Sequence, residues 1–204
     1  MITVHCLAYS RAIRLIWLME DLGQPYDLVR YDRTDAFRAP PELRAVHPLG
    51  KSPGIEDGDL RLAESASCLR YLTRKFDDRA HAPEPGTPAH ARHEEMLDYV
   101  ESSFAAACMD VLLPAMTGED LPDHARKTLN MHLAYIAQNL PDHGLLFGDR
   151  ATLADIQMSY LLANLAAGGF LAKEPRVQAY WHELQQQPGY RAATGGAGPM
   201  APDL

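Results

Sequence analysis

The first 76 residues carry the hydrophobic spacing of short strands that alternate with helices. Apolar residues at every second position predict a strand, and a dense run of helix formers predicts a helix. Gly23 stands where a helix would need its C-cap, and Asp57-Gly58 is a hairpin turn signal. The predicted elements are a strand at 2–8, a helix at 11–22, a strand at 25–31, a hairpin of 53–55 and 60–62, and a helix at 65–76.

From residue 88 onward the pattern predicts helices alone. Thr87 and Pro88 form a good helix start, since Thr is a suitable N-cap and Pro suits the first helical position. The tail from Gly195 is rich in Gly, Pro and Ala, so we expect it to be loose. The predicted helices are 88–113, bent or stopped before Pro114, then 122–139, the very apolar and central 153–167, and 175–187.

A proline-rich stretch separates the two patterns. Residues 77–88 contain three prolines, the last of them at the helix start, and little that could pack in a core, which is typical of an interdomain linker. The sequence therefore predicts an α/β domain at 1–77, a linker at 78–87 and an all-α domain at 88–204. In the first domain, the strand-helix-strand part favours a parallel pair with a right-handed crossover, to which the hairpin adds antiparallel strands.

Composition and charge narrow the possible partners. Apolar residues make up 47% and charged residues 23% of the 204, which is ordinary for a globular protein. The net charge of −8 disfavours nucleic acid, because phosphate binding needs a basic surface. No apolar run approaches the ~20 residues of a membrane span, and the N-terminus lacks a basic segment followed by an apolar one. We therefore expect no membrane partner and no signal peptide.

The cysteines and histidines predict neither a disulfide framework nor a metal site. Cys6, Cys68 and Cys108 are odd in number and far apart, which fits a reducing cytoplasm, and no Cys-x-x-Cys pair exists. His90-x-x-His93, beside Glu94 and Glu95, is the histidine pair with ligand spacing. A solvated helix start is the interpretation we adopt there, and we assign no metal.

The stretch from His47 to Ser65 combines features that would suit a small anionic ligand. Lys51 lies on a loop, Pro53 precedes a short apolar strand, and Glu64-Ser65 stands where a helix begins. Backbone N–H groups at a helix start have no partner within the helix and carry partial positive charge, so a carboxylate can bind there.

A second local motif begins the central helix. Thr152 and Asp155 have the spacing of a capping box, in which each side chain bonds the backbone N–H of the other residue. We expect this pair to stabilise the fold without contacting a ligand.

In order and spacing, these elements resemble the cytosolic glutathione transferase family. The family pattern reads roughly Asn-Pro-x-Gly-Lys-Val-Pro-x-Leu-x-Asp-Gly, then Leu-x-Glu-Ser, then Ile-Leu-x-Tyr-Leu. The chain departs from it with His47 for Asn, Ser52 for Val, and Gly54-Ile55 after the proline. Residues 147–155 are similar to the family's Gly-Asp-x-x-Thr-x-Ala-Asp element, so the resemblance covers about residues 2–193. It implies a thioredoxin-like domain followed by a helical bundle, in a bacterial-type member with a serine-like active site.

The resemblance also implies how glutathione would be held. Glu64 would accept from the ligand ammonium, and Ser65 with the helix N-terminus would bind the adjacent α-carboxylate. Lys51 would pair with the glycine carboxylate. Ser52 would offer its backbone N–H and C=O to the central cysteine, much like an added strand. That role requires a cis peptide bond before Pro53.

The thiol-activating hydroxyl of the family stands between the first strand and the first helix. Aligning residues 10–14 with the family's Ser-x-x-x-Arg pattern puts Ser10 in this position. In isolation Ser10 would be interpreted as an N-cap. Tyr9 is the runner-up, because some family classes use a tyrosine near this point. Cys6 is third, since it falls on the apolar side of the predicted strand.

A second substrate would bind between the two domains, with Arg11, Tyr99 and Ser103 as candidate contacts. Met96, Phe104 and Ala107 are further candidates, although residues at this helical spacing could equally form core or dimer interface. The family usually forms homodimers, and we expect the same here. Asp98 or Glu101 would then be positioned near the partner's ammonium site.

Three functions remain open at this point. The first is an enzyme, a glutathione S-transferase that adds the glutathione thiolate to small hydrophobic electrophiles. The second is a glutathione-dependent disulfide or peroxide reductase on the same scaffold. The third is a non-catalytic, transferase-like binding protein. The intact set of Lys51, Pro53, Glu64 and Ser65 argues against complete loss of the ligand site.

Overall fold

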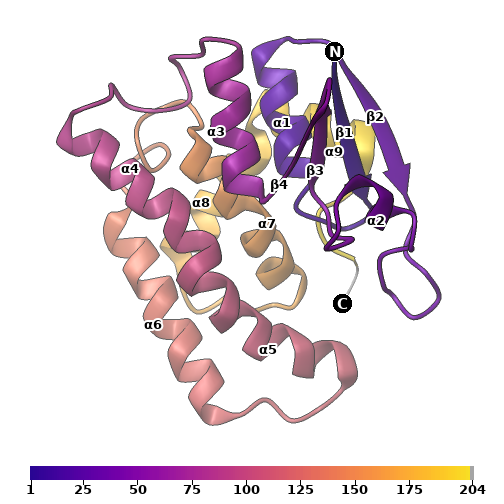
Figure 1. Cartoon of the computed structure of the whole chain (residues 1–204). Helices are drawn as coiled ribbons and strands as arrows, with labels where there is room; N and C mark the ends of the chain where they lie inside the picture. The colour runs from indigo at the N-terminus through magenta and orange to yellow at the C-terminus, as the bar shows by residue number, and fades with distance from the viewer. Residues whose placement is uncertain (203–204) are drawn as a thin grey trace. The chain divides into compact units, whose positions relative to one another are not determined.

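The computed structural model describes residues 1–202 and divides into two compact units (Figure 1). One unit contains Met1–Arg79 together with Gln187–Met200, and the other is built mainly from Ala80–Gln186. The division after residue 79 falls inside the predicted linker. The grouping of residues 187–200 with the first unit differs from the prediction, which placed every residue from 88 onward in the second domain.

A mixed four-stranded sheet forms the centre of the first unit. Its strands are β1 (Ile2–Leu7), β2 (Tyr26–Tyr31), β3 (Gly54–Asp57) and β4 (Leu60–Ala63). Among the described residues their order is β2-β1-β3-β4, with β1 parallel to β2 and the other pairs antiparallel. This is the predicted strand-helix-strand unit with an added hairpin. The hairpin loop is Gly58-Asp59, one residue later than the predicted Asp57-Gly58, because Asp57 pairs with Leu60.

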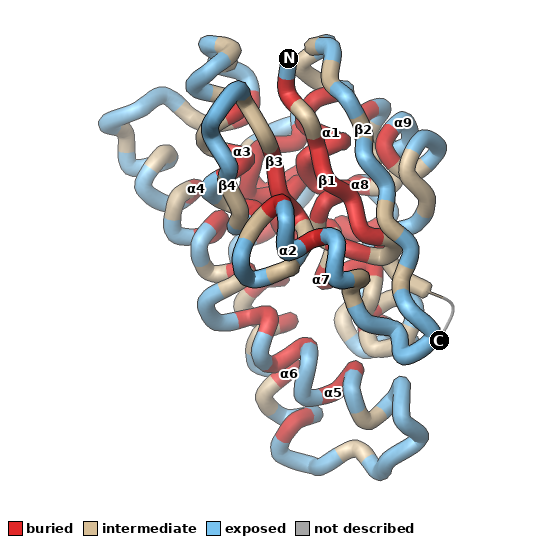
Figure 2. Tube along the Cα trace, turned by 45° about the vertical axis from the view of Figure 1, so that its right-hand side comes forward, coloured by how far each residue is buried: buried red, intermediate tan, exposed pale blue. Residues whose placement is uncertain are grey.

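Helices cover both faces of this sheet. Helices α1 (Ile13–Leu22) and α3 (Ser65–Lys75) pack on one face, and the short α2 (Leu43–Val46) lies on the other (Figure 1). Figure 2 shows most of β1 and α1 as buried, whereas β2 and β4 at the sheet edges contain no buried residue. Gly23 ends α1 in the left-handed conformation, with φ of 60°, as its position predicts.

Helix α9 (Pro188–Ala197) completes the first unit by packing on α1. The Tyr190 ring meets the Trp17 ring edge-on, with centroids 5.5 Å apart. A Cβ at Gly189 would lie 2.2 Å from a carboxylate oxygen of Asp21 and 2.4 Å from Trp17, so glycine is required there. The tail that was expected to be loose from Gly195 is therefore helical as far as Ala197.

The second unit is all-helical, as predicted. It contains α4 (Pro88–Tyr99), a π-helical turn η1 (Val100–Phe104), α5 (Ala105–Thr117), α6 (Asp123–Asn139), α7 (Leu153–Ala167) and α8 (Pro175–Gln186). Eleven of the fifteen residues of α7 are buried, and this helix contacts α4, α5 and α8. The central position expected for α7 is confirmed.

The long helix departs from its predicted course in one respect. It does not stop before Pro114, which lies inside α5, and the helix continues to Thr117 with Gly118 as C-cap. The helix is irregular earlier, at η1, where the backbone hydrogen bonds span five residues, as in a π-helix, instead of four. Thr117 Oγ1 donates to the carbonyl of Leu113 in the last turn of the helix.

Asp155 is the polar centre of the α7 N-terminus. Both halves of the predicted capping box with Thr152 are present. One carboxylate oxygen accepts from the Thr152 N–H at 2.8 Å, and the other accepts from the Leu146 N–H and the Tyr180 hydroxyl. Burial raises the pKa of this carboxyl, and these donors oppose the rise. Asp155 therefore joins the start of α7 to the preceding loop at Leu146 and to α8 at Tyr180, which agrees with the predicted structural role.

A histidine supplies another cap that the sequence did not reveal. The Ala154 N–H donates to Nε2 of the fully buried His93, so the His93 proton lies on Nδ1 and faces Glu94 Oε1 at 3.2 Å. The Leu153 N–H donates to the carbonyl of His81. Burial lowers the pKa of His93. The neutral imidazole is thus part of the helix start.

We predict that His93 makes the fold sensitive to acid. The folded-state pKa lies below the ordinary 6.5, so below about pH 6.5 the unfolded chain binds a proton that the folded chain resists. The contribution of His93 to the free energy of unfolding is therefore fully present above about pH 6.5. It falls on acidification by at most about 1.4 kcal/mol per pH unit. His93→Gln keeps an acceptor for Ala154 without titrating, and should flatten the fall in melting temperature between pH 7.5 and 5.

Part of the pH dependence should remain in this variant, because burial also lowers the pKa of His5 and His132. Thermal melts of both proteins across the same buffers would decide the matter. Parallel curves for the wild type and His93→Gln would contradict the prediction.

Candidate functional site

The loop after β1 is held in a strained conformation. Tyr9 has a φ of 53°, which is uncommon for a residue with a side chain. Arg33 fixes the loop from outside, since its Nε donates to the carbonyl of Ala8 and its Nη2 to that of Tyr9, both at 2.9 Å. The Arg33 guanidinium also lies 4.4 Å from the centroid of the Phe37 ring, on which Tyr9 stacks. These contacts fix the backbone of the loop that leads from β1 through Ser10 to the start of α1 at Ile13.

Ser10 is 5% exposed and contacts a second serine. Its Oγ lies 3.0 Å from Ser52 Oγ and accepts from the Ala12 N–H at 3.2 Å. The latter bond resembles a local cap, so the alternative interpretation of Ser10 describes part of what it does. The hydroxyl proton is not used in that bond and can be donated elsewhere. Ser10 therefore combines a backbone anchor with a movable donor.

The loop before β3 brings the next two candidate residues to β1. The peptide bond between Ser52 and Pro53 is cis, as predicted. Gly50, with a φ of 58°, makes the turn that precedes Lys51, and a Cβ there would lie 2.8 Å from Arg44 Cγ. Lys51 itself is exposed, and Pro53 is buried. The loop thus presents a charged side chain to solvent beside a fixed serine.

The start of α3 carries the remaining candidates. Glu64 is exposed and has a φ of 69°, and its carbonyl accepts from the Cys68 N–H in the first turn of α3. Ser65 is buried, and its Oγ accepts from Nη1 of Arg14 at 3.1 Å. Arg14 is completely buried, so a cation lies directly behind a helix N-terminus. Both features favour a negative charge at this point.

The structure joins several of these predicted residues directly and others through the chain. Ser10 contacts Ser52, and Arg14 links α1 to Ser65. Lys51 and Glu64 come next to this cluster as the sequence neighbours of Ser52 and Ser65. Sequence reasoning used Arg14 only to align the family pattern and gave it no role. The signal available was an arginine among the apolar residues of α1, which is unusual unless the cation has a partner.

The cysteine thiols are poor candidates for the reactive group. Burial raises the pKa of Cys6 to about 11 and that of Cys68 to about 12. A thiol reacts as its thiolate, so both groups are almost entirely inactive near neutral pH. This result argues against Cys6, the third candidate for the activating position.

Among the candidates for a second-substrate pocket, most are engaged within the helical unit. The Tyr99 hydroxyl lies 2.7 Å from His132 Nδ1, and its ring stacks on the buried Phe104. Met96 and Ala107 are also buried, whereas Ser103 is exposed on η1 and Arg11 is half-buried. The burial of Met96, Phe104 and Ala107 favours the core interpretation for these three. The pocket role of Arg11, Tyr99 and Ser103 stays a prediction.

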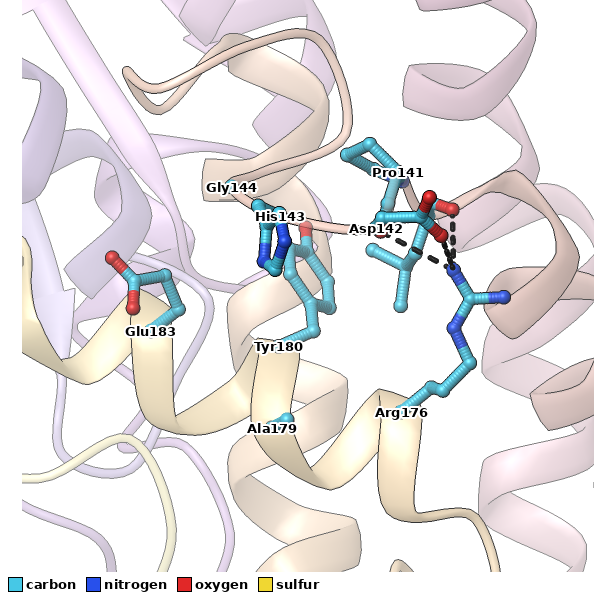
Figure 3. Close-up of a pocket in the computed structure, with 9 residues that line it drawn as sticks. Pro141, Asp142, His143, Gly144, Arg176, Ala179, Tyr180 and Glu183 are labelled. Carbon is cyan, nitrogen blue, oxygen red and sulfur yellow. Dashed lines mark hydrogen bonds and ion pairs between the residues drawn. The ribbon is translucent and has the colours of Figure 1, made fainter.

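A pocket of about 230 Å³ lies within the helical unit, between α8 and the loop after α6 (Figure 3). Arg176 at its wall donates to the carbonyls of Leu140 and Pro141, and Tyr180 donates to the buried Asp155. These polar groups connect α8 to the end of α6 and the start of α7. Since Arg176 and Tyr180 already bond protein groups that join the helices, we do not assign this pocket as a ligand site.

His90, His93 and Glu94 could bring one ligand atom each within 4.8 Å of one another. However, the two ring nitrogens of His93 already face the Ala154 N–H and Glu94. A metal on Nδ1 would move the proton to Nε2 and place two donors against each other at the start of α7. The donor set therefore does not suit a metal ion.

Comparisons with known proteins connect this geometry to a family. Residues 2–74 match the family described as Glutathione S-transferase, N-terminal domain, and residues 95–188 match Glutathione S-transferase, C-terminal domain. The chain is 30% identical to Glutathione S-transferase 1 of Saccharomyces cerevisiae over 94% of its own length and 93% of the relative's. It is 27% identical to Glutathione S-transferase 3 of Schizosaccharomyces pombe, over 95% and 86% of the two chains.

Solved structures agree with the sequence matches. A glutathione S-transferase from Actinobacillus pleuropneumoniae has a TM-score of 0.85 and 30% identity, covering 98% of this chain and 94% of that one. A sphingomonad glutathione S-transferase complexed with glutathione has the same fold, with a TM-score of 0.77 and 22% identity over 96% and 98% of the two chains. In the described residues no helix is both long and apolar enough to span a membrane. The chain belongs to the glutathione S-transferase family and uses glutathione as its substrate.

Proposed function

We propose that this transferase conjugates the glutathione thiolate to small, electrophilic, hydrophobic substrates, with Ser10 as the residue that stabilises the thiolate. The observation that carries the assignment is the position of the Ser10 hydroxyl. It lies 3.0 Å from Ser52, which directly precedes the cis-proline, and its oxygen is anchored by the Ala12 N–H. A donor fixed at this point can hydrogen-bond a sulfur held beside Ser52.

The other residues of the site would hold the tripeptide by its charged ends. Ser65 and the N-terminus of α3, backed by Arg14, suit the α-carboxylate of the γ-glutamyl end. The exposed carboxylate of Glu64 suits the neighbouring ammonium. Lys51 suits the glycine carboxylate, and the backbone of Ser52 would bond the central cysteine in the manner of an added strand. The proposed site would therefore offer an opposite charge to each charged group of glutathione and backbone hydrogen bonds to its central cysteine.

The energy that Ser10 must supply is modest. A free thiol with a pKa of about 8.5 is only about 3% thiolate at pH 7. Lowering that pKa by about two units requires about 2.7 kcal/mol of preferential stabilisation of the thiolate. One oriented hydroxyl together with the positive end of a helix can provide this.

We further propose that Arg11, Tyr99 and Ser103 contact the electrophile.

The location proposed for this chemistry is a reducing cytoplasm. The support is that Cys6, Cys68 and Cys108 are buried free thiols, as expected for proteins of that compartment.

Replacing Ser10 should separate thiol activation from binding. Ser10→Ala removes the donor but no charged contact, so glutathione affinity should change little while the pKa of the bound thiol rises. We expect kcat/KM with a chromogenic electrophile to fall by about 10- to 100-fold at pH 6.5, and by less at pH 9. Thiolate absorbance in the ultraviolet, followed against pH with calorimetric titration, measures both quantities.

Tyr9→Phe is the matched control for this experiment, because it removes the neighbouring hydroxyl and keeps the ring that stacks on Phe37. Its bound-thiol pKa should equal that of the wild type. A raised pKa of the bound thiol in Tyr9→Phe, with an unchanged one in Ser10→Ala, would assign the activating role to Tyr9.

Disulfide reduction by the wild type without any conjugation of an electrophile would favour the reductase hypothesis.

Lys51 should contribute to glutathione affinity without affecting the chemical step. Lys51→Met removes the cation expected at the glycine carboxylate, so KM for glutathione should rise by about tenfold while kcat stays nearly constant. The loss should shrink as ionic strength rises. Lys173→Met, on an exposed residue of the helical unit, is the control and should leave KM unchanged. Equal KM values for both variants would contradict the assignment.

We also propose that the protein is a homodimer, as its family membership suggests. The exposed side of α5 carries Met109, Leu113 and Met116 at helical spacing, with Leu113 53% exposed. Sedimentation should therefore give twice the chain mass of 22.6 kDa. A single-chain mass at micromolar concentration would refute the proposal.

A further inference from the structure

Ser52 makes more hydrogen bonds with its side chain than a loop serine needs. Its Oγ accepts from the Leu7 N–H at 3.2 Å, donates to the carbonyl of His5 at 3.2 Å, and lies 3.0 Å from Ser10 Oγ. The family pattern has a valine at this position, which could make none of these bonds. The side chain of Ser52 is therefore a distinctive feature of this chain beside the proposed activating residue.

The protons of the two serines can be assigned from these partners. Each hydroxyl has one proton and can accept two hydrogen bonds. A carbonyl can only accept, so the Ser52 proton points to His5, and Ser10 must donate to Ser52. In this arrangement the Ser10 proton is occupied by Ser52. Ser10 Oγ then accepts from Ala12 alone among these groups.

A thiolate beside Ser10 would favour the opposite arrangement. If both hydroxyls rotate, Ser52 donates to Ser10, and Ser10 donates to the sulfur. Ser10 Oγ then accepts two hydrogen bonds, from the Ala12 N–H and the Ser52 hydroxyl. Two donors acting on one oxygen polarise its O–H bond and strengthen the bond that it donates. The rotation breaks the side-chain bond to His5, which belongs to the inner strand β1, paired on both sides.

We propose that Ser52 is a positioning residue that donates to Ser10 when the thiolate is bound and so strengthens the Ser10–sulfur hydrogen bond. This inference rests on the proposed role of Ser10. It is additional to the backbone contact of Ser52 with glutathione, because a valine could supply that contact equally. No bond is made or broken covalently, and both protons remain on their own oxygens.

The sharpest test compares Ser52→Thr with Ser52→Val. The two side chains have nearly the same shape, and only threonine keeps a hydroxyl. The bound-thiol pKa, read from thiolate absorbance against pH, should be close to that of the wild type in Ser52→Thr. In Ser52→Val it should be higher, with about a threefold smaller thiolate fraction at pH 6.5. Glutathione affinity should be similar in the two variants, since the backbone of residue 52 is unchanged.

The same comparison in a Ser10→Ala background shows whether Ser52 acts through Ser10. There, Ser52→Val and Ser52→Thr should give equal thiol pKa values. A difference of the same size in both backgrounds would overturn the proposal, because Ser52 would then act on the sulfur directly or through the loop. A lower pKa in Ser52→Val than in Ser52→Thr would also overturn it, since Ser52 would then be a competitor for the Ser10 proton.

Failure of this inference can be distinguished from failure of the proposed function. If Ser10→Ala alone leaves the thiol pKa unchanged, the role of Ser10 itself is wrong. If Ser10→Ala raises the pKa but the Thr and Val variants are equal, only the role of Ser52 is wrong. Ser52→Ala removes the hydroxyl without adding bulk, so it should repeat the Ser52→Val result. A thiol pKa in Ser52→Ala equal to that of the wild type would show that the hydroxyl is not needed, and would overturn the role of Ser52.

Discussion

The attachment of Ser52 to β1 is the constraint on which the geometry of the site depends. One side chain bonds the backbone at Leu7 and at His5, and so ties the loop before β3 to the end of the inner strand. Ser10 follows that same strand by three residues and meets the same hydroxyl. Residues that are 42 positions apart in the chain are thereby held at hydrogen-bond distance. The site is built at a strand end, where the sheet fixes the backbone and the loops supply the chemistry.

Arg14 imposes a second constraint, of electrostatic origin. Burying a guanidinium costs several kcal/mol unless its surroundings compensate, so the buried Arg14 needs partners that offset this cost. Here it points to Ser65 at the start of α3, where the backbone already favours an anion. An anionic ligand at this position would therefore be stabilised by two sources of positive potential, one from a helix end and one from a side chain that water does not screen.

The sequence predicted the sheet and most helix bounds because each depends on local signals, whereas the ligand-site candidates came from the family resemblance. Alternation, Gly23 and the Thr152–Asp155 spacing act over a few residues. The errors concern features that depend on distant partners. The end of helix α9, from Gly195, is rich in Gly and Ala and resembles a loose tail, and only the packing of α9 on Trp17 and Asp21 explains why Gly189 must be glycine.

The cap formed by His93 shows the same limit of sequence reasoning. The imidazole and the Ala154 N–H that it caps are 61 residues apart. Its i, i+3 spacing with His90 instead indicated a surface helix start. The contacts of Ser52 were invisible for the same reason, since a serine before a proline carries no sign that its hydroxyl reaches a strand 45 residues earlier.

The proposed site would treat a glutathione thiol differently from the protein's own buried thiols Cys6 and Cys68. Cys6 and Cys68 have apolar surroundings that raise their pKa values to about 11 and about 12, so at pH 7 only about one Cys6 thiol in ten thousand is ionised. A glutathione thiol beside Ser10 would instead meet a hydroxyl donor near the start of a helix. Burial without donors and exposure to a donor shift the same ionisation in opposite directions. With Cys6 and Cys68 protonated, the thiolate of the bound substrate would be the sulfur available to an electrophile in the proposed site.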